Sequence, residues 1–168
     1  MMGLMIEPSE RDAPELEQLG ITGVLRASFR TVTYNSSLLV EPHRRGWPGF
    51  FDEPIDHLYW IVTQRGVHRA WGRHQQTTDR YAVVLGTVEV ALIDGRNPQG
   101  SDPVPLIVAL DGAAGEGLLI PPGVWHTFRS TTDQAVLLNS KSPPFEPDDV
   151  DKQVLPMPND QFSFVWGS

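Results

Sequence analysis

Short apolar or alternating runs, separated by turn residues, make up most of the chain from residue 21 onward. Each run has the length of a strand and is bounded by Gly, Pro, Asn, Asp or Ser, the residues that favour turns. Many short strands at this spacing are typical of an antiparallel sandwich or barrel. We therefore expect strands within 23–40, 57–66, 67–74, 79–86, 87–95, 104–110, 117–123, 125–131 and 134–140.

The two ends of the chain lack this pattern. Residues 9–20 have the composition of one short helix, capped near Ser9 and stopped at Gly20. The stretch after Lys141 contains five prolines and is unsuited to a long regular element. We expect an N-terminal helix or strand arm over 1–20, a barrel over 21–145, and an irregular tail over 146–168 that packs on the barrel through Phe162, Phe164 and Trp166.

The composition indicates one globular domain. The chain has 168 residues, 40% apolar and 20% charged, and its lack of cysteine excludes disulfides, thiolate metal sites and cysteine nucleophiles. A formal charge of -8 argues against binding to a nucleic acid backbone. No apolar run is long enough to span a membrane and no signal peptide is evident, so we expect a cytoplasmic protein.

Two spaced motifs resemble the signatures of the cupins. In "GEGLLIPPGVWHTFRS", Gly115, Pro121, Gly123 and His126 keep the spacing of the second cupin motif. Pro and Gly form the tight turn between two strands, and the His then points into the barrel. The resemblance implies an all-β fold, the cupin double-stranded β-helix or jelly-roll barrel.

The first cupin motif is present in altered form between Gly66 and Gly86. The spacing holds throughout, but Gly72 stands at the first His position and Asp79 replaces the usual Glu. The second His position is kept by His74.

From about Arg44 to the C-terminus, the chain is similar to the dTDP-4-dehydrorhamnose 3,5-epimerase family. The stretches that carry this similarity are "RRGWPGFF", "RGVHRAW", "VEVALIDGRNPQG", "LIPPGVWHTF" and "NSKSPPFEPDD". The resemblance implies proton transfer beside the 4-keto group of a nucleotide-linked sugar, by a His base, a Lys at the enolate oxygen and a Tyr acid. It also implies a homodimer in which a strand within 21–40 joins the sheet of the partner.

Carried over residue by residue, the family pattern is incomplete. Arg69 matches the phosphate-binding Arg, whereas the base position falls on Gly72, the Lys position on Asp79 and the Tyr position on Asn139. Asp160 lies near the place of the Asp that orients the base in the family. The chain therefore resembles a divergent member that lacks the usual catalytic His, Lys and Tyr.

Other residues are candidates for the lost chemistry. His74, His68 and Asp79 are candidate catalytic residues, because an imidazole beside a carboxylate can exchange protons near neutral pH. A hydrogen-bonded structural His is the alternative for His68. The candidate substrate-binding residues are Arg69, His126, Asn139 and Arg45.

His74, Asp79 and His126 occupy three of the four metal-ligand positions of cupins, and two imidazoles with one carboxylate suit a divalent metal. A hydrogen-bonded cluster is the alternative. Because the resembling family generally works without metal, we expect no cofactor, and a divalent metal stays possible.

Three functions follow from these residues. The first is a divergent isomerase or epimerase acting on a nucleotide-linked keto sugar or another small carbonyl compound. The second is a non-catalytic cupin that binds such a ligand, which the loss at Gly72 and Asn139 would suit. The third is a metal-dependent cupin enzyme. The fold alone does not separate them.

Overall fold

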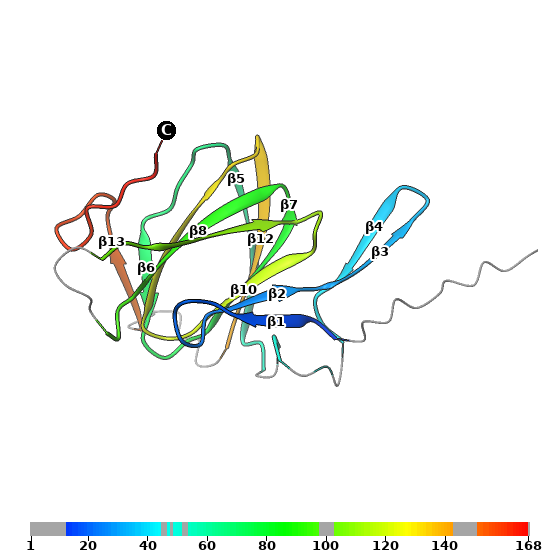
Figure 1. Cartoon of the computed structure of the whole chain (residues 1–168), viewed down its shortest axis with the longest axis horizontal. Coiled ribbons are helices and arrows are strands. Elements are labelled where there is room, and N and C mark those ends of the chain that lie inside the picture. Colours follow the sequence, from blue (N-terminus) through cyan, green and yellow to red (C-terminus); the bar gives the residue numbers. More distant parts are fainter. Residues whose placement is uncertain are drawn as a thin grey trace, which may run out of the picture.

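The computed structural model describes residues 13–44, 47, 49–51, 54–97, 103–142 and 151–167. The regular structure of this part of the chain consists of strands, arranged in two antiparallel sheets that form the walls of a barrel and a separate two-stranded hairpin (Figure 1). The all-β jelly-roll prediction is confirmed. Within the described residues, no helix has the length and apolar character that crossing a membrane requires.

The larger sheet has six strands in the order β1-β2-β10-β7-β12-β5. Strand β12 lies between β7 and β5, so that Asn139 is opposite Tyr81 on one side and Tyr59 on the other. The strands of this sheet are β1 (Glu15–Gln18), β2 (Leu25–Ser28), β5 (His57–Gln64), β7 (Asp79–Leu85), β10 (Glu116–Ile120) and β12 (Gln134–Lys141).

The smaller sheet has five strands in the order β13-β6-β11-β8-β9. Strand β6 pairs with β11 at Gly72 and His126, and β13 pairs with the other edge of β6. The strands of this sheet are β6 (Trp71–His74), β8 (Thr87–Asp94), β9 (Leu106–Asp111), β11 (Val124–Ser130) and β13 (Lys152–Leu155).

Apolar side chains from both sheets meet between them and form the main core. The alternation that the sequence predicts is clearest in β9, where Val108 and Leu110 are buried and Ile107 and Ala109 are exposed. Each fully buried side chain of this size stabilises the fold by about 1.5–3 kcal/mol. Further members of this core are Val83, Val88, Val90, Leu92, Leu118, Phe128 and Leu137.

Gly86 makes the turn from β7 into β8. Its φ of +73° lies in the left-handed region that favours glycine. A Cβ atom at this position would lie 2.3 Å from the carbonyl oxygen of Gln134, so a side chain does not fit. This is the final Gly of the first cupin motif, and the turn it makes sets the start of β8.

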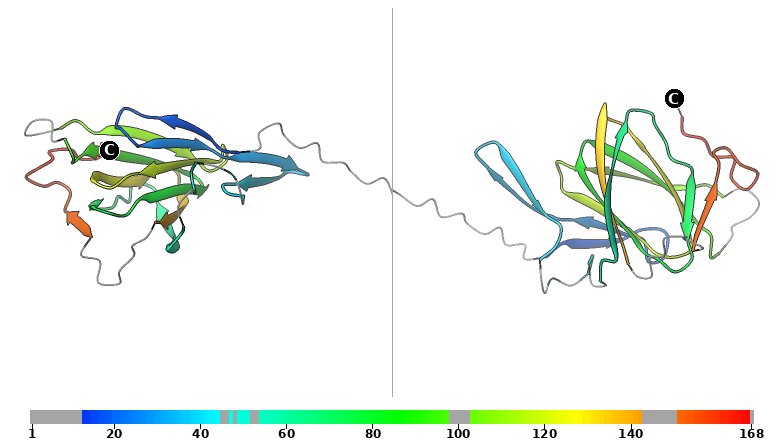
Figure 2. Two further views of the ribbon diagram at one scale, coloured as in Figure 1. Left: turned by 90° about the horizontal axis from the view of Figure 1, so that it is seen from below. Right: turned by 180° about the vertical axis from the view of Figure 1, so that it is seen from behind.

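The N-terminal part of the described chain is strand rather than helix. Glu15–Gln18 pairs with β2 and extends the larger sheet, so the helix expected over 9–20 is not formed by these four residues. The next strands, β3 (Arg30–Tyr34) and β4 (Ser37–Glu41), form a hairpin that projects away from the barrel (Figures 1 and 2). Asn35 and Ser36, both with positive φ, make its tight turn.

The C-terminal tail packs on the outside of the smaller sheet. Phe162, one of the aromatic residues expected to dock there, is buried in a cluster with Trp71 and Trp125. The tail is not wholly irregular, because Lys152–Leu155 adds a strand beside β6. The register of this pair sets Lys152 opposite His74 and brings Asp151 to the same end of β6.

Candidate functional site

A cavity of about 120 Å³ opens between the two sheets. Its lining comes from both walls of the barrel, because inward-facing residues of several strands converge there. The polar and charged residues that line it are Tyr59, Arg69, His74, Asp79, Tyr81, His126, Thr127, Asn139 and Lys152.

His74 is held at both ring nitrogens. Its Nδ1 lies 2.9 Å from Oδ2 of Asp151, and its Nε2 lies 2.9 Å from Nζ of Lys141. A carboxylate accepts hydrogen bonds and an ammonium donates them, so we assign the proton to Nδ1 and the lone pair to Nε2. The imidazole is thereby held in the tautomer of a general base.

Asp151 is fixed by the backbone that follows β6. The N–H groups of Gln75 and Gln76 donate to Oδ1 at 2.9 and 2.7 Å, and the N–H of Thr77 donates to Oδ2 at 3.3 Å. Burial acts to raise the pKa of Asp151, but the hydrogen bonds from Thr77, His74 and the backbone outweigh it, so the pKa is lowered. Asp151 is therefore an ionised carboxylate at neutral pH, locked in one orientation.

Asp79 lies between the two histidines of the cavity. Its Oδ2 lies 3.6 Å from Nε2 of His74 and 3.5 Å from Nε2 of His126. Its Oδ1 accepts a hydrogen bond of 2.8 Å from Nδ2 of Asn139, which also donates to the hydroxyl of Tyr59 at 2.8 Å. This network holds a phenol and a carboxylate on the same wall of the cavity, on either side of Asn139.

His126 and Tyr81 form an uncharged part of the wall. Their rings lie 5.8 Å apart in an edge-on contact. Burial lowers the pKa of His126 and raises the pKa of Tyr81 well above its usual value, so both are neutral near pH 7. Nδ1 of His126 lies 3.1 Å from the carbonyl oxygen of Val124, an acceptor, so this nitrogen carries the proton.

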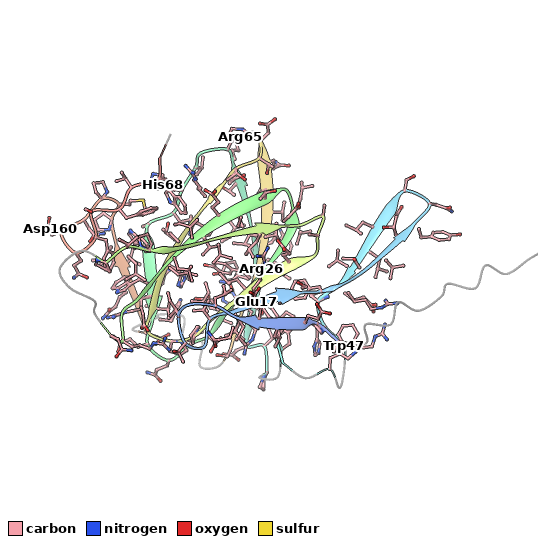
Figure 3. All side chains as sticks on the ribbon, viewed as in Figure 1. Glu17, Arg26, Trp47, Arg65, His68 and Asp160 are labelled. Carbon is pink, nitrogen blue, oxygen red and sulfur yellow. The ribbon has the colours of Figure 1, made fainter. Side chains whose placement is uncertain are left out.

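The structure brings together five of the residues predicted from the sequence: His74, Asp79, His126, Asn139 and Arg69 all line the cavity. His68 does not join them. It lines a separate surface cavity with Arg65, Arg129 and Trp166. Figure 3 labels His68 and Arg65. Arg45 lies outside the described residues.

Sequence reasoning missed the residues that hold His74. Asp160, suggested as an orienting carboxylate, is exposed on the tail (Figure 3), and Asp151 is the carboxylate in contact with His74. Lys141 was also missed, although it stands two positions after Asn139 and so faces the same side of β12. Tyr59 could be found only through the pairing of β5 with β12.

The residues proposed as metal ligands do not fit a divalent cation in this arrangement. Nε2 of His74 accepts a hydrogen bond from the Lys141 ammonium, and a cation bound to the same nitrogen would lie against that positive charge. Among the described residues, no group of three or more His, Cys, Asp or Glu side chains is arranged to hold a metal ion.

No protein-family model matches the chain, and no curated protein matches it. Solved structures do, among them dTDP-sugar isomerases and epimerases. A dTDP sugar isomerase from Desulfovibrio desulfuricans G20 is 24% identical, with a TM-score of 0.75 over 87% of this chain and 92% of that one. This match shows that the two proteins share their fold.

Two further neighbours differ in their chemistry. A dTDP-4-dehydrorhamnose 3,5-epimerase from Bacillus anthracis, solved with TDP and PPi bound, has a TM-score of 0.74 at 13% identity over 92% of this chain and 90% of that one. The sugar 3,4-ketoisomerase QdtA from Thermoanaerobacterium thermosaccharolyticum, in complex with TDP, has a TM-score of 0.61 at 20% identity. The match covers 79% of this chain and 88% of QdtA.

Proposed function

We propose that this protein is an isomerase or epimerase of a nucleotide-linked keto sugar, with His74 as the base that removes a proton beside the ketone. The observation that carries the proposal is the placement of His74 in the cavity wall between Asp151 and Lys141. The Lys141 ammonium donates to Nε2 of His74, so this hydrogen bond has to be released before Nε2 takes a proton from the substrate. The base thus stands two residues after Gly72, on the same face of β6.

The surrounding residues suit an enolate intermediate. When Nε2 of His74 takes the proton, the C–H electron pair forms the enolate double bond and the carbonyl electrons move onto oxygen. The Lys141 ammonium supplies positive charge beside the base for this developing oxyanion. Asp151 stabilises the imidazolium that forms, as a carboxylate on Nδ1 does in other enzymes.

The fate of the proton decides the reaction. If the ketone migrates from C4 to C3, the enolate oxygen on C4 gains a proton, the hydroxyl on C3 gives up its own and becomes the new carbonyl, and the His74 imidazolium returns the proton it removed from C3 to C4 on the same face. If an acid delivers a proton from the opposite face, the carbon is epimerised, and Tyr59 is the candidate acid because its hydroxyl lines the same cavity. The neighbours include enzymes of both kinds, and two of them were solved with TDP.

Proton NMR of dTDP-4-keto-6-deoxyglucose with the purified protein in D2O tests the proposal. Loss of the C3 or C5 proton signal indicates epimerase chemistry, and appearance of a 3-keto sugar indicates ketone migration. Ligand line broadening without exchange or conversion would instead support the non-catalytic binding function, for which Gly72 and Asn139 are the evidence. Absence of all three effects would contradict a nucleotide-sugar ligand of this type.

We also propose that the protein is a homodimer. Strand β5 is an edge of the larger sheet, and its outward residues Leu58, Trp60 and Val62 are 54%, 70% and 56% exposed. The projecting hairpin exposes Leu38 and Leu39 as well. An unpaired edge with an apolar face favours pairing with another chain, and a second copy supplies a matching hairpin.

A further inference from the structure

The chain contains only two lysines, and both are at this site. Lys141 is buried and contacts His74. Lys152 follows Asp151 directly, begins β13 and lines the cavity with an exposed side chain. Every other basic residue of the chain besides the histidines is an arginine.

The side chain of Lys152 lies over Gly72. A Cβ atom built on Gly72 would lie 3.8 Å from Cε of Lys152 and 3.8 Å from Nε2 of His126. The space above Gly72 is therefore bordered by Lys152 on one side and His126 on the other. Burial is the main cause of the lowered pKa of His126, and the positive charge of Lys152 lowers it further, which agrees with their closeness.

Arg69 is the second exposed cation of the cavity. Elsewhere, arginines pair with carboxylates, as Arg26 does with Glu116 and Arg129 with Glu89. For the side chains of Arg69 and Lys152, no ion pair or hydrogen bond with the described residues is found. Two cations without acidic partners at one opening are suited to an anionic ligand.

We propose that Lys152, extended over Gly72, binds the diphosphate of the nucleotide-linked ligand together with Arg69. Under this proposal, glycine at position 72 has a role: a Cβ alone would be in ordinary contact with Lys152 at 3.8 Å, but a longer side chain would extend into the space that Lys152 occupies. The inference rests on the proposed function for its choice of anion. It assigns Lys152 to ligand binding and leaves proton transfer to His74.

Because Lys152 is exposed and Lys141 is buried, reductive methylation with ¹³C-formaldehyde gives a strong lysine signal from Lys152 and a weaker one from Lys141, beside that of the α-amine. Methylation keeps the positive charge. The Lys152 signal is assigned by its loss in Lys152→Arg. We expect addition of dTDP to shift the Lys152 signal strongly and the Lys141 signal less.

Calorimetric titration with dTDP provides the second measurement. We expect Lys152→Met to raise the Kd about tenfold, the usual effect of losing one charge-assisted hydrogen bond, and Lys152→Arg to restore most of the affinity. Arg65→Met is the matched control, since Arg65 is exposed, pairs with Asp133 and lines a different cavity. Gly72→Val should weaken dTDP binding more than Gly72→Ala, because the γ carbons of the introduced valine reach toward Lys152.

The double variant Gly72→Val with Lys152→Met should bind no more weakly than the weaker single variant, since both changes remove the same interaction. Binding of dTDP with an unmoved Lys152 signal and an unchanged Kd in Lys152→Met would overturn the inference. Failure of wild-type protein to bind dTDP would overturn it too. If the keto sugar still exchanges its proton in either case, the proposed function stands and only the role of Lys152 is lost.

Discussion

Nδ1 of His74 lies 2.9 Å from Oδ2 of Asp151, although the two residues are 77 positions apart in the chain. The contact exists because β13 pairs with β6, which places the segment around Asp151 at the end of the strand that carries His74. Neither residue defines the site alone. The carboxylate sets the tautomer of the imidazole, and the backbone amides of Gln75 and Gln76 set the orientation of the carboxylate.

Asp151→Asn should reverse that tautomer. The amide oxygen would take the place of Oδ1, which accepts from Gln75 and Gln76, so the NH2 group would face Nδ1 of His74. His74 would then carry its proton on Nε2 and lose its function as a base. We expect kcat to fall by about 10²–10⁴-fold with a smaller change in KM, measured by steady-state kinetics. A kcat within threefold of wild type would contradict this role.

The lowered pKa of His126 predicts a pH dependence of stability. Since the folded-state pKa lies below the ordinary value of 6.5, the unfolded chain binds this proton more readily. The neutral imidazole contributes its full stability above pH 6.5, and that contribution is lost as the pH falls from 6.5 toward the folded-state pKa. His126→Gln removes this dependence.

The effect on stability is measured by urea unfolding of wild type and His126→Gln at several pH values. The values lie between about 8 and 5, the range in which an imidazole titrates. As the pH falls, the free energy of unfolding of wild type should decline relative to that of His126→Gln. Parallel curves over the whole range would show that His126 has the same pKa in both states.

Metal removal should leave activity unchanged. The Lys141 ammonium on Nε2 of His74 occupies the side from which a cation would be bound. We expect dialysis against EDTA to alter kcat by less than about twofold, with metal content measured by plasma mass spectrometry. Loss of activity that a divalent ion restores would support the metal-dependent function instead, with His74, Asp79 and His126 as its ligands.

A charge on the apolar edge should separate the dimer. Trp60 is 70% exposed in the middle of edge strand β5, so Trp60→Glu would introduce a carboxylate into the proposed interface. We expect sedimentation velocity to give a dimer for wild type and a monomer for the variant. Val104→Glu is the control, because Val104 is 92% exposed and lies on the segment before β9. A wild-type monomer would contradict the proposal.

The sequence predicted the barrel more fully than the site. Alternating runs and turn glycines such as Gly86 are local signals, and each of them maps to a strand or turn that the structure contains. The helix expected near Ser9 failed for Glu15–Gln18, because pairing with β2 outweighs local helix preference.

The site was predicted only where a motif carries it. His74, Asp79 and His126 lie in spaced motifs and converge as expected. Asp151 and Lys152 come from an edge strand in a proline-rich tail, and nothing in the local sequence reports that this strand pairs with β6. His68 and His74 could not be separated by strand periodicity, since the chain between Gln64 and Trp71 departs from regular strand structure.

The most direct test compares wild type, His74→Asn and His68→Asn in the D2O exchange of dTDP-4-keto-6-deoxyglucose followed by proton NMR. His68→Asn is a matched control, because His68 lines the separate surface cavity. Our account predicts exchange or conversion by wild type and His68→Asn, and a rate at least about a hundredfold lower in His74→Asn. Undiminished exchange in a folded His74→Asn protein would contradict the assignment of His74 as the base.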